Sequence, residues 1–474
     1  MKPFYIFNTL SRSVEEFHPL NPPEVRMYSC GPTVYLPQHL GNLRAYLCWD
    51  FLRRALEFNG YKVRHVMNVT DVGHMTNDDE EAGEDKIEKT AREQGKSPLE
   101  IAKFYLAKFQ RDCAALNLRL PTPPLLCRAT DHIAAMHSLI ARILEKGYAY
   151  VTPSGVYFDV EKYRGPDGIG RLSRQRLEEQ DPGQRLEHSA DKKSPHDFVL
   201  WVLDRSDHLL QWDSPWGRGY PGWHIECSAM SMEYLGETID IHTGGIDNMP
   251  VHHEDEIAQS ESATGKPFVR YFVHNAFLVG KEGAKISKSA GKFPLLDDLV
   301  AAGVNPMAFR LLCFGAKYRS ELAFTLDAAR AAEKQLYYLW GFAATANAED
   351  RDSPWAHEYL ERFTEALSDD LNTPEALAVV LELVRTAYRK SDHRIWSTLK
   401  LVDSVLGLRL EEQFRFLHES VPPADIQALI DARTEARKKK DFGQSDALRM
   451  ELVARGWNVK DNRNGTSMYE PRWN

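Results

Sequence analysis

The amino-acid sequence contains no long hydrophobic run, no dense set of cysteines and no nucleotide-binding P-loop of the GxxxxGK[ST] type. No stretch approaches the roughly 18 uninterrupted apolar residues of a membrane-spanning helix. The six cysteines are scattered without a Cys-x-x-Cys pair, which excludes a disulfide framework. The first residues lack the charged start and apolar core of a signal peptide. We therefore expect a cytoplasmic protein with no membrane partner.

An excess of positive charge is also missing. Lys and Arg number 59 against 68 Asp and Glu, which gives a formal net charge of −9. This balance excludes a protein that coats nucleic acid with its whole surface, but not one that binds through a single basic face. Hydrophobic residues make up 43% of the 474 residues, as in a globular protein. That length predicts about three or four structural units.

The N-terminal part alternates between strand and helix patterns. Residues Val25 to Cys30 are short and apolar and end before Gly31-Pro32, and Val63 to Val69 alternate and are rich in valine. Between them, apolar residues recur with helical spacing from Leu43 to Leu56, and Gly60 follows as a helix stop. This order predicts an α/β fold with a doubly wound parallel sheet, whose ligand crevice would lie at residues 31–42.

Further elements are predicted along the rest of the chain. They are a hairpin over Ala149–Val160 that turns at Ser154-Gly155, a loop-rich insertion over 165–222, strands over Thr238–His242 and Tyr271–Val279, a helix over Val251–Ala263, helices from Asp297, and a small unit from Pro422. Gly217 to Gly222 matches GxGxxG by letter, but Pro221 stands where a helix should run, so we expect an irregular loop there.

Four residues have the chemistry of a metal site. His252 and Glu256 are four apart on a predicted helix, so both can face one point, although such a pair alone is more often an exposed helix face. Cys30 ends the first strand, and Cys227 lies near a second sheet element. Two thiolates, an imidazole and a carboxylate suit a tetrahedral zinc ion if the sheet brings them together.

Two other motifs could contact phosphate. His39 and Asn42 stand at the start of the first long helix, where they could donate to an anion together with free backbone N–H groups, or could merely cap the helix. Lys285 and Lys288 lie three apart in a glycine-flanked basic loop and could stabilise charge on a polyphosphate. Each motif alone is weak evidence for a phosphate-binding site.

Taken together and in this order, the motifs resemble the cysteinyl-tRNA synthetase family of class I aminoacyl-tRNA synthetases. The resemblance runs essentially end to end. It is carried by Phe7–Leu10, Met27–Tyr35, Asn68–Asp71, Pro221–Met230, Asp240–His242, His252–Ser260, Lys285–Ser289 (like the KMSKS loop), Asp370–Glu375 and Arg437–Leu452.

The resemblance implies an enzyme that activates L-cysteine with ATP and transfers it to tRNA(Cys), with one Zn²⁺ per chain selecting the substrate thiolate and Mg²⁺ accompanying ATP. It also implies a monomer. The implied zinc ligands are Cys30, Cys227, His252 and Glu256, and the implied cysteine-binding residues are Cys30, Gly31, Thr70, Trp223 and His224. The implied ATP-binding residues are His39, Asn42, Gly244, Gly245, Asp247 and Lys288, and the implied catalytic residues are His39, Asn42, Lys285 and Lys288.

The resemblance further implies six segments. They are a Rossmann-like catalytic domain in two halves (1–125 and 221–284) around an inserted domain (126–220), a KMSKS-loop and stem-contact region (285–345), a tRNA-binding helical bundle (346–420) and a small anticodon-binding unit (421–474). In the last unit Arg433, Arg437, Lys438, Lys439 and Lys440 form the densest basic cluster, for which we expect phosphate contacts.

Two residues depart from the family pattern. Asn42 replaces the second histidine of the HIGH signature; its amide still donates a neutral hydrogen bond, so only charge and pH dependence change. Thr243 stands in a loop that is often all glycine, where close approach of a nucleotide is easier.

Three other functions compete with this interpretation. A cysteine ligase of the mycothiol type would share the zinc site and adenylation but act on an amino sugar; the C-terminal basic segment argues against it. A zinc hydrolase built on His252, His253 and Glu256 lacks the HExxH spacing and leaves Lys285 to Ser289 unexplained. A tRNA- or metal-binding protein without catalysis would agree with Asn42 but not with both loop lysines.

Overall fold

The structure is a computed structural model. It describes residues 2–72, 85–163, 168–175, 191–203, 208–280, 294–343, 345, 352–419, 422–455, 457–461 and 467–471. No helix in these ranges is both long enough and apolar enough to cross a lipid bilayer.

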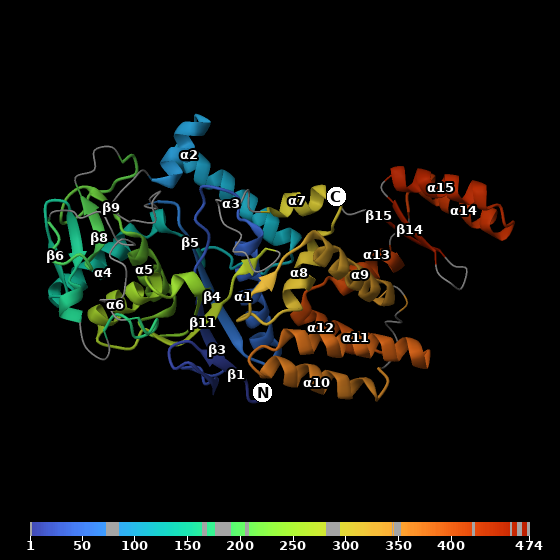
Figure 1. Ribbon diagram of the computed structural model, residues 1–474, viewed down its shortest axis with the longest axis horizontal. Coiled ribbons are helices and arrows are strands. Elements are labelled where there is room, and N and C mark those ends of the chain that lie inside the picture. Colours follow the sequence, from blue (N-terminus) through green and yellow to red (C-terminus); the bar gives the residue numbers. More distant parts are fainter. Residues whose placement is uncertain are drawn as a thin grey trace.

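A five-stranded sheet in the order β11-β10-β3-β4-β5 forms the centre of the molecule, and all neighbouring strands are parallel (Figure 1). Its strands are β3 (Glu24–Ser29), β4 (Lys62–Val69), β5 (Leu126–Arg128), β10 (Ile239–Gly245) and β11 (Val269–Asn275). The predicted α/β parallel-sheet class is confirmed. The strands are almost entirely buried, as expected when helices cover a parallel sheet.

Helices α1, α5 and α6 pack against this sheet or against each other. Their bounds are α1 (Leu40–Phe58), α5 (Trp223–Leu235) and α6 (His252–Thr264). The N-terminal part of the chain also contains β1 (Tyr5–Asn8), β2 (Ser13–Glu16), α2 (Lys86–Gln94) and α3 (Pro98–Ala115).

A second sheet lies to one side of the central one and has the order β6-β7-β8-β9 (Figure 1). Its elements, with the helix that precedes it, are α4 (Ile133–Glu145), β6 (Ala149–Val151), β7 (Gly155–Phe158), β8 (Phe198–Leu203) and β9 (Gly219–Pro221). The hairpin predicted over Ala149–Val160 is therefore confirmed. The irregular loop expected at Gly217–Gly222 is wrong in part, because Gly219–Pro221 pairs with β8.

The strand predicted over Tyr271–Val279 is also wrong as one element. β11 ends at Asn275, and a separate strand β12 (Leu278–Val279) pairs with β13 (Leu322–Ala323) in another sheet. The continuous apolar composition of this segment hides the break. Arg44 of α1 stabilises the bend, because its guanidinium donates to the carbonyl oxygens of Ala276 and Phe277.

The second half of the chain is mainly helical, as predicted. Its helices are α7 (Leu296–Ala301), α8 (Pro306–Phe314), α9 (Leu326–Ala343), α10 (Ala356–Ser368), α11 (Thr373–Lys390), α12 (Trp396–Leu406) and α13 (Leu410–Glu419). A small C-terminal unit follows, with α14 (Ala424–Lys438), α15 (Phe442–Ala454), β14 (Trp457–Asp461) and β15 (Ser467–Pro471). Figure 1 shows this unit apart from the two sheets. It has its own apolar core around Ile426, Leu452, Trp457 and Val459.

A buried carboxylate on α1 holds the helical half against the sheet. Oδ2 of Asp50 accepts hydrogen bonds from Arg54 Nε (2.7 Å) and Arg310 Nη2 (2.7 Å), and Oδ1 accepts from the backbone N–H of Arg119 (3.0 Å). Burial alone would raise the pKa of Asp50, but the charges of Arg310 and Arg54 outweigh it and hold that pKa below its ordinary value.

The guanidiniums of Arg54 and Arg310 also donate hydrogen bonds to backbone carbonyl oxygens at helix C-termini. Arg310 Nε donates to Leu406 O at the end of α12 (2.6 Å), and Arg54 Nη1 donates to Ser404 O (3.1 Å). Arg310 Nη1 further donates to Leu116 O, which follows α3 (3.1 Å). Cations are favourable at helix C-termini, so these arginines join α1, α3, α8 and α12 at one point.

We predict that Asp50→Asn lowers the free energy of unfolding by about 3–5 kcal/mol, because it leaves two guanidiniums buried without their counter-charge. Since the folded-state pKa of Asp50 is depressed, its contribution is present above about pH 4 and is lost as the pH falls through that pKa. The difference in unfolding free energy between wild type and variant should therefore become smaller in acid. Urea unfolding at several pH values measures both effects.

The matched control is Glu57→Gln on the same helix. Glu57 pairs with Arg53 and Arg119 at 2.9 Å, but its side chain is 28% exposed. Its removal should cost no more than about 1 kcal/mol. Equal destabilisation by the two variants would show that the Asp50 junction has no special role.

Candidate functional site

The predicted site residues lie along the carboxyl edge of the central sheet. Cys30 follows β3 directly, Thr70 follows β4, and Gly244 and Gly245 end β10. Parallel strands bring these positions to one edge, which is where ligands bind in open α/β sheets. α6 begins at His252, shortly after β10, and returns across the same edge.

The structure brings the four predicted metal ligands together. Ligand atoms of Cys30, Cys227, His252 and Glu256 all lie within 4.8 Å of one another, and all four residues are buried. They come from the end of β3, from α5 and from α6. A second group that could hold a metal shares two of these residues and consists of Cys30, His242, His253 and Glu256.

The donor set fits a metal ion. Oε1 of Glu256 lies 3.0 Å from Nε2 of His252. A fully buried carboxylate is costly unless a cation neutralises it, and a metal ion shared with the neighbouring thiols and imidazole would do so. Two sulfurs, one nitrogen and one oxygen are a known ligand combination for tetrahedral zinc.

Electrostatics in the cluster follow from its burial. Burial alone would raise the pKa of Glu256, but His242 and His252 outweigh it and hold that pKa at about 2. The hydrogen bond from the Cys227 thiol to Cys30 and burial raise the pKa of Cys227 well above the ordinary thiol value. Burial likewise raises the pKa of Cys30. Metal binding must therefore displace thiol protons at neutral pH.

Residues predicted to surround the amino acid lie beside the cluster. The backbone N–H of Gly31 donates to Asn68 Oδ1 (2.6 Å), and Asn68 Nδ2 donates to Thr70 Oγ1 (3.1 Å). Thr70 Oγ1 donates in turn to Glu226 Oε2 (2.9 Å). A Cβ at Gly31 would overlap the carbonyl oxygen of Asn68, so only glycine fits there.

Trp223 and His224 begin α5 and meet the metal cluster from that side. The rings of Trp223 and His252 are 4.6 Å apart between centroids. Nδ1 of His224 lies 2.6 Å from Nδ1 of His252, and its Nε2 lies 3.5 Å from Asp255 Oδ2. The structure therefore groups both residues with a predicted metal ligand.

The HIGH-like motif forms the N-terminus of α1. His39 is the N-cap; its Nδ1 accepts the backbone N–H of Asn42 (3.2 Å), and its own N–H donates to Asn42 Oδ1 (3.3 Å). The N–H of Leu40 is also occupied, by Pro294 O (2.9 Å). Two backbone N–H groups of the first turn are therefore occupied, that of Asn42 by the His39 cap and that of Leu40 by Pro294.

The predicted basic loop with Lys285 and Lys288 lies outside the described residues. The residues on both sides of it approach α1. Leu295 pairs with His39 in a β-bridge, and Pro294 accepts from Leu40. On the other side, the guanidinium of Arg44 on α1 donates to Phe277 O, just before β12.

The two departures from the family pattern have local partners. Asn42 completes the capping box of α1, as described above. Thr243 lies opposite Ser29 in the β10–β3 register, and its hydroxyl donates to Ser29 Oγ (2.7 Å). Its side chain is directed into the sheet in this way. At the next position a Cβ on Gly244 would overlap the ring of His253, so glycine is required.

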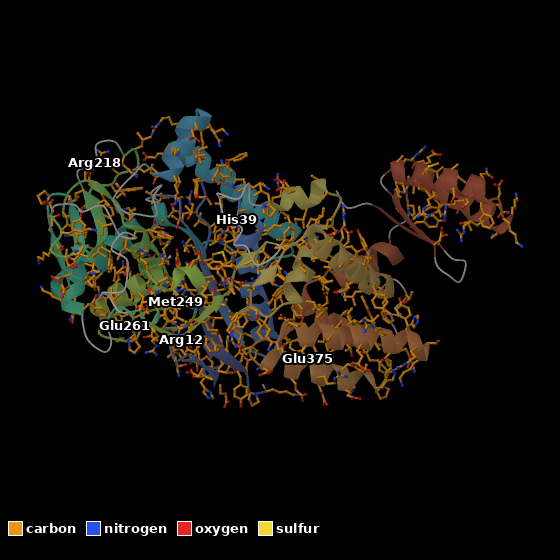
Figure 2. The ribbon with its side chains drawn as sticks, in the orientation of Figure 1. Arg12, His39, Arg218, Met249, Glu261 and Glu375 are labelled. Carbon is orange, nitrogen blue, oxygen red and sulfur yellow. The ribbon has the colours of Figure 1, made fainter. Side chains whose placement is uncertain are left out.

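A loop of the region predicted as an insertion contacts α6 and the N-terminal segment. Glu254 of α6 accepts the backbone N–H groups of Leu172 (2.8 Å) and Ser173 (2.6 Å). Arg12 donates to Leu172 O (2.9 Å) and approaches Met249 Sδ (3.6 Å), and both labelled side chains lie near each other in Figure 2. Sequence reasoning missed these anchors, because nothing in the pattern pairs residue 12 with residue 172.

The basic cluster of the C-terminal unit is only partly exposed. Arg433 is fully buried and forms a bidentate ion pair with Asp461 (3.0 and 2.9 Å), so the expected phosphate contact is wrong for this residue. Lys438 and Lys439 are 70% and 72% exposed. Phe442, which sequence reasoning missed, is 63% exposed. The available signal was an aromatic residue two positions after a run of lysines.

Comparisons with known proteins agree with this arrangement. Residues 16–334 match the family model of the class I (C) tRNA synthetase catalytic domain, 362–411 the DALR domain, and 422–467 the cysteinyl-tRNA ligase anticodon binding domain. Cysteine--tRNA ligase 1 of Burkholderia lata is 44% identical over 98% of this chain and 97% of its own length. Cysteine--tRNA ligase of Treponema denticola is 42% identical over 98% of both chains.

Solved structures support the fold. Methionyl-tRNA synthetase of Mycobacterium tuberculosis with methionyl-adenylate has a TM-score of 0.57 at 14% identity, covering 89% of this chain and 96% of its own. A leucyl enzyme, LeuRS of Agrobacterium radiobacter, has a TM-score of 0.55 at 11% identity and covers 85% of each chain. Sheet topology and these neighbours define a class I aminoacyl-tRNA synthetase fold. Within that class, the chain belongs to the cysteinyl-tRNA synthetase family.

Proposed function

We propose that the chain activates L-cysteine with ATP to cysteinyl-adenylate and pyrophosphate, and then transfers the cysteinyl group to the 3′ end of tRNA(Cys). The observation that carries this proposal is the buried Cys30–Cys227–His252–Glu256 cluster at the carboxyl edge of the sheet. Family membership supports both steps. We also propose that the chain divides into the six segments given above and that it is a monomer.

The cluster suits a Zn²⁺ ion, one per chain, that selects the substrate. Zinc would supply a Lewis acid that holds the substrate thiol as a thiolate at neutral pH. Gly31 and Thr70 on one side and Trp223 and His224 on the other would enclose the amino acid. Serine offers a hydroxyl instead, which is a far weaker zinc ligand, so selection would need no editing site.

ATP, with Mg²⁺ on its phosphates, would lie beside the N-terminus of α1. His39 and the side-chain amide of Asn42 would donate to the phosphates, with Gly244, Gly245 and Asp247 lining the nucleotide. Lys285 and Lys288 would stabilise charge as the carboxylate of cysteine attacks the α-phosphorus and pyrophosphate leaves. In this step the side chains position the reactants and stabilise charge, and none needs to accept a proton.

The C-terminal unit would bind the anticodon side of the tRNA. Lys438 and Lys439 are exposed at the end of α14, and Phe442 is exposed at the start of α15. Exposed cations beside an exposed aromatic ring suit a phosphate backbone and an unstacked base. The unit that matches the anticodon-binding model argues against the mycothiol-type ligase.

Transfer of labelled cysteine to total tRNA with ATP tests the function. We expect ribonuclease-sensitive counts with cysteine and none with serine. Pyrophosphate exchange with cysteine but no charged tRNA would favour an adenylating ligase with a small-molecule acceptor. Absence of both reactions would overturn the proposal.

For the metal site, we predict that Cys227→Ala lowers the zinc content and raises the KM for cysteine at least about tenfold. The reason is that the tetrahedral set then lacks one of its sulfur ligands. Elemental analysis and steady-state kinetics measure the two effects. The control is Cys48→Ala, which removes a buried thiol of α1 outside the cluster and should keep the zinc. Normal zinc and normal KM in Cys227→Ala would contradict the site.

For the tRNA surface, we predict that the triple variant Lys438→Ala/Lys439→Ala/Lys440→Ala raises the KM for tRNA and leaves pyrophosphate exchange unchanged. The salt dependence of tRNA binding should flatten by about one unit for each lysine–phosphate pair that the substitutions remove. A control with the same charge change replaces three exposed lysines elsewhere, Lys103, Lys146 and Lys334. If both triples weaken tRNA binding equally, the effect is one of net charge and the surface is misassigned.

A further inference from the structure

Arg44 on α1 is a buried cation whose hydrogen-bond acceptors are all backbone carbonyl oxygens. The residue is 1% exposed and forms no ion pair within the part of the chain that the structure describes. Two other buried arginines, Arg54 and Arg310, both pair with Asp50. A buried cation without a counter-charge is costly in free energy, so stability alone does not account for Arg44.

The guanidinium of Arg44 bridges two chain segments. Nη1 donates to the carbonyl oxygens of Ala276 (2.9 Å) and Phe277, which lie between β11 and β12. Nη2 donates to the carbonyl oxygen of Ser320 and lies 3.5 Å from that of Lys317, in the turn before β13. A planar guanidinium has separate donors at a fixed spacing for the two segments, whereas the ammonium group of a lysine is a single point. The shape of this side chain is therefore needed as well as its charge.

The two segments are also hydrogen-bonded to each other. The backbone N–H of Ala276 donates to Tyr318 O (2.9 Å), and β12 pairs with β13. The backbone N–H of Leu322 donates to Phe277 O (3.1 Å). We call residues 276–279 and 317–323 the platform. The platform continues directly from β11, an edge strand of the central sheet, so a group that binds the platform is held relative to that sheet.

The first turn of α1 lies against the same platform. A Cβ on Gly41 would lie 3.8 Å from Cβ of Leu278, which is an ordinary contact distance, so these two residues adjoin. Gly41 and Arg44 are three positions apart and therefore share one face of the helix. The start of α1 thus packs on the platform, and Arg44 provides the polar attachment of that contact.

These contacts join two sides of the proposed ATP site. The first turn of α1, proposed to bind the phosphates, begins after His39. Gly245, proposed to line the nucleotide, lies opposite Asn275 in the β10–β11 register. Asn275 directly precedes Ala276, whose carbonyl oxygen accepts from Arg44. The guanidinium therefore connects the helix that would hold the phosphates with the strand ends that would hold the nucleoside.

We propose that Arg44 is a positioning residue for the adenylation step, which sets the spacing between the first turn of α1 and the ends of β10 and β11. The inference rests on the proposed function and adds a residue that would touch neither ATP nor cysteine. The residues proposed to hold cysteine follow β3 and β4 or belong to α5 and α6, and none of them supplies a carbonyl oxygen to Arg44. Loss of the guanidinium should therefore affect the use of ATP and not the binding of cysteine.

The test compares Arg44→Lys with wild type in cysteine-dependent pyrophosphate exchange by the full chain. Lysine keeps the charge but loses the planar fork, so kcat/KM for ATP should fall about 10–100-fold, because small misplacements of reacting groups have effects of this size. The KM for cysteine and the zinc content should match wild type. The control is Arg54→Lys, the same change at another buried arginine of the same helix. This variant should be less stable but keep the wild-type kcat/KM for ATP.

An unchanged kcat/KM for ATP in Arg44→Lys would overturn the inference, and so would an equal loss in Arg54→Lys or an equal rise in the KM for cysteine. If Arg44→Lys does not accumulate as folded protein, hydrogen exchange of the wild type tests the same link. A sulfamoyl analogue of cysteinyl-adenylate should raise the protection of backbone amides in residues 40–45 and 276–279 together, and a rise in only one of these segments would contradict the link. A wild type without pyrophosphate exchange would instead overturn the proposed function itself.

Discussion

The buried charge of Asp50 is the interaction on which the arrangement of the two halves depends. The Asp50 carboxylate accepts hydrogen bonds from the guanidiniums of Arg54 and Arg310. Arg310 also donates to backbone carbonyl oxygens at the ends of α3 and α12. α1 carries this carboxylate in its middle and the His39 cap at its start. The helix that would orient ATP is therefore the helix that holds the helical half. Any tilt of the helical half relative to the sheet must strain this junction, so buried polar contacts fix the distance between the helical half and the proposed ATP site.

A second constraint is the desolvation of the metal cluster. α6 buries His252, His253, Glu254, Asp255 and Glu256 in succession, which no ordinary amphipathic helix does. Each side chain needs a specific partner, because an unpaired buried charge costs several kcal/mol. Glu254 accepts hydrogen bonds from backbone N–H groups of the inserted loop. Glu256 forms a hydrogen bond with His242 and would also bind the proposed ion. The partners come from the inserted loop, β10 and the end of β3, so the site exists only when these parts are assembled.

Sequence patterns predicted the parallel sheet and most of its strands, because periodicity and stop residues report local structure directly. They failed where tertiary contacts decide. The segment 271–279 has the pattern of one strand, yet Arg44 captures the carbonyls of Ala276 and Phe277 and splits it. Arg433 stands in an apparently exposed basic cluster, yet Asp461 buries it. The four metal ligands could be proposed from their chemistry and the family resemblance, but their convergence required the fold.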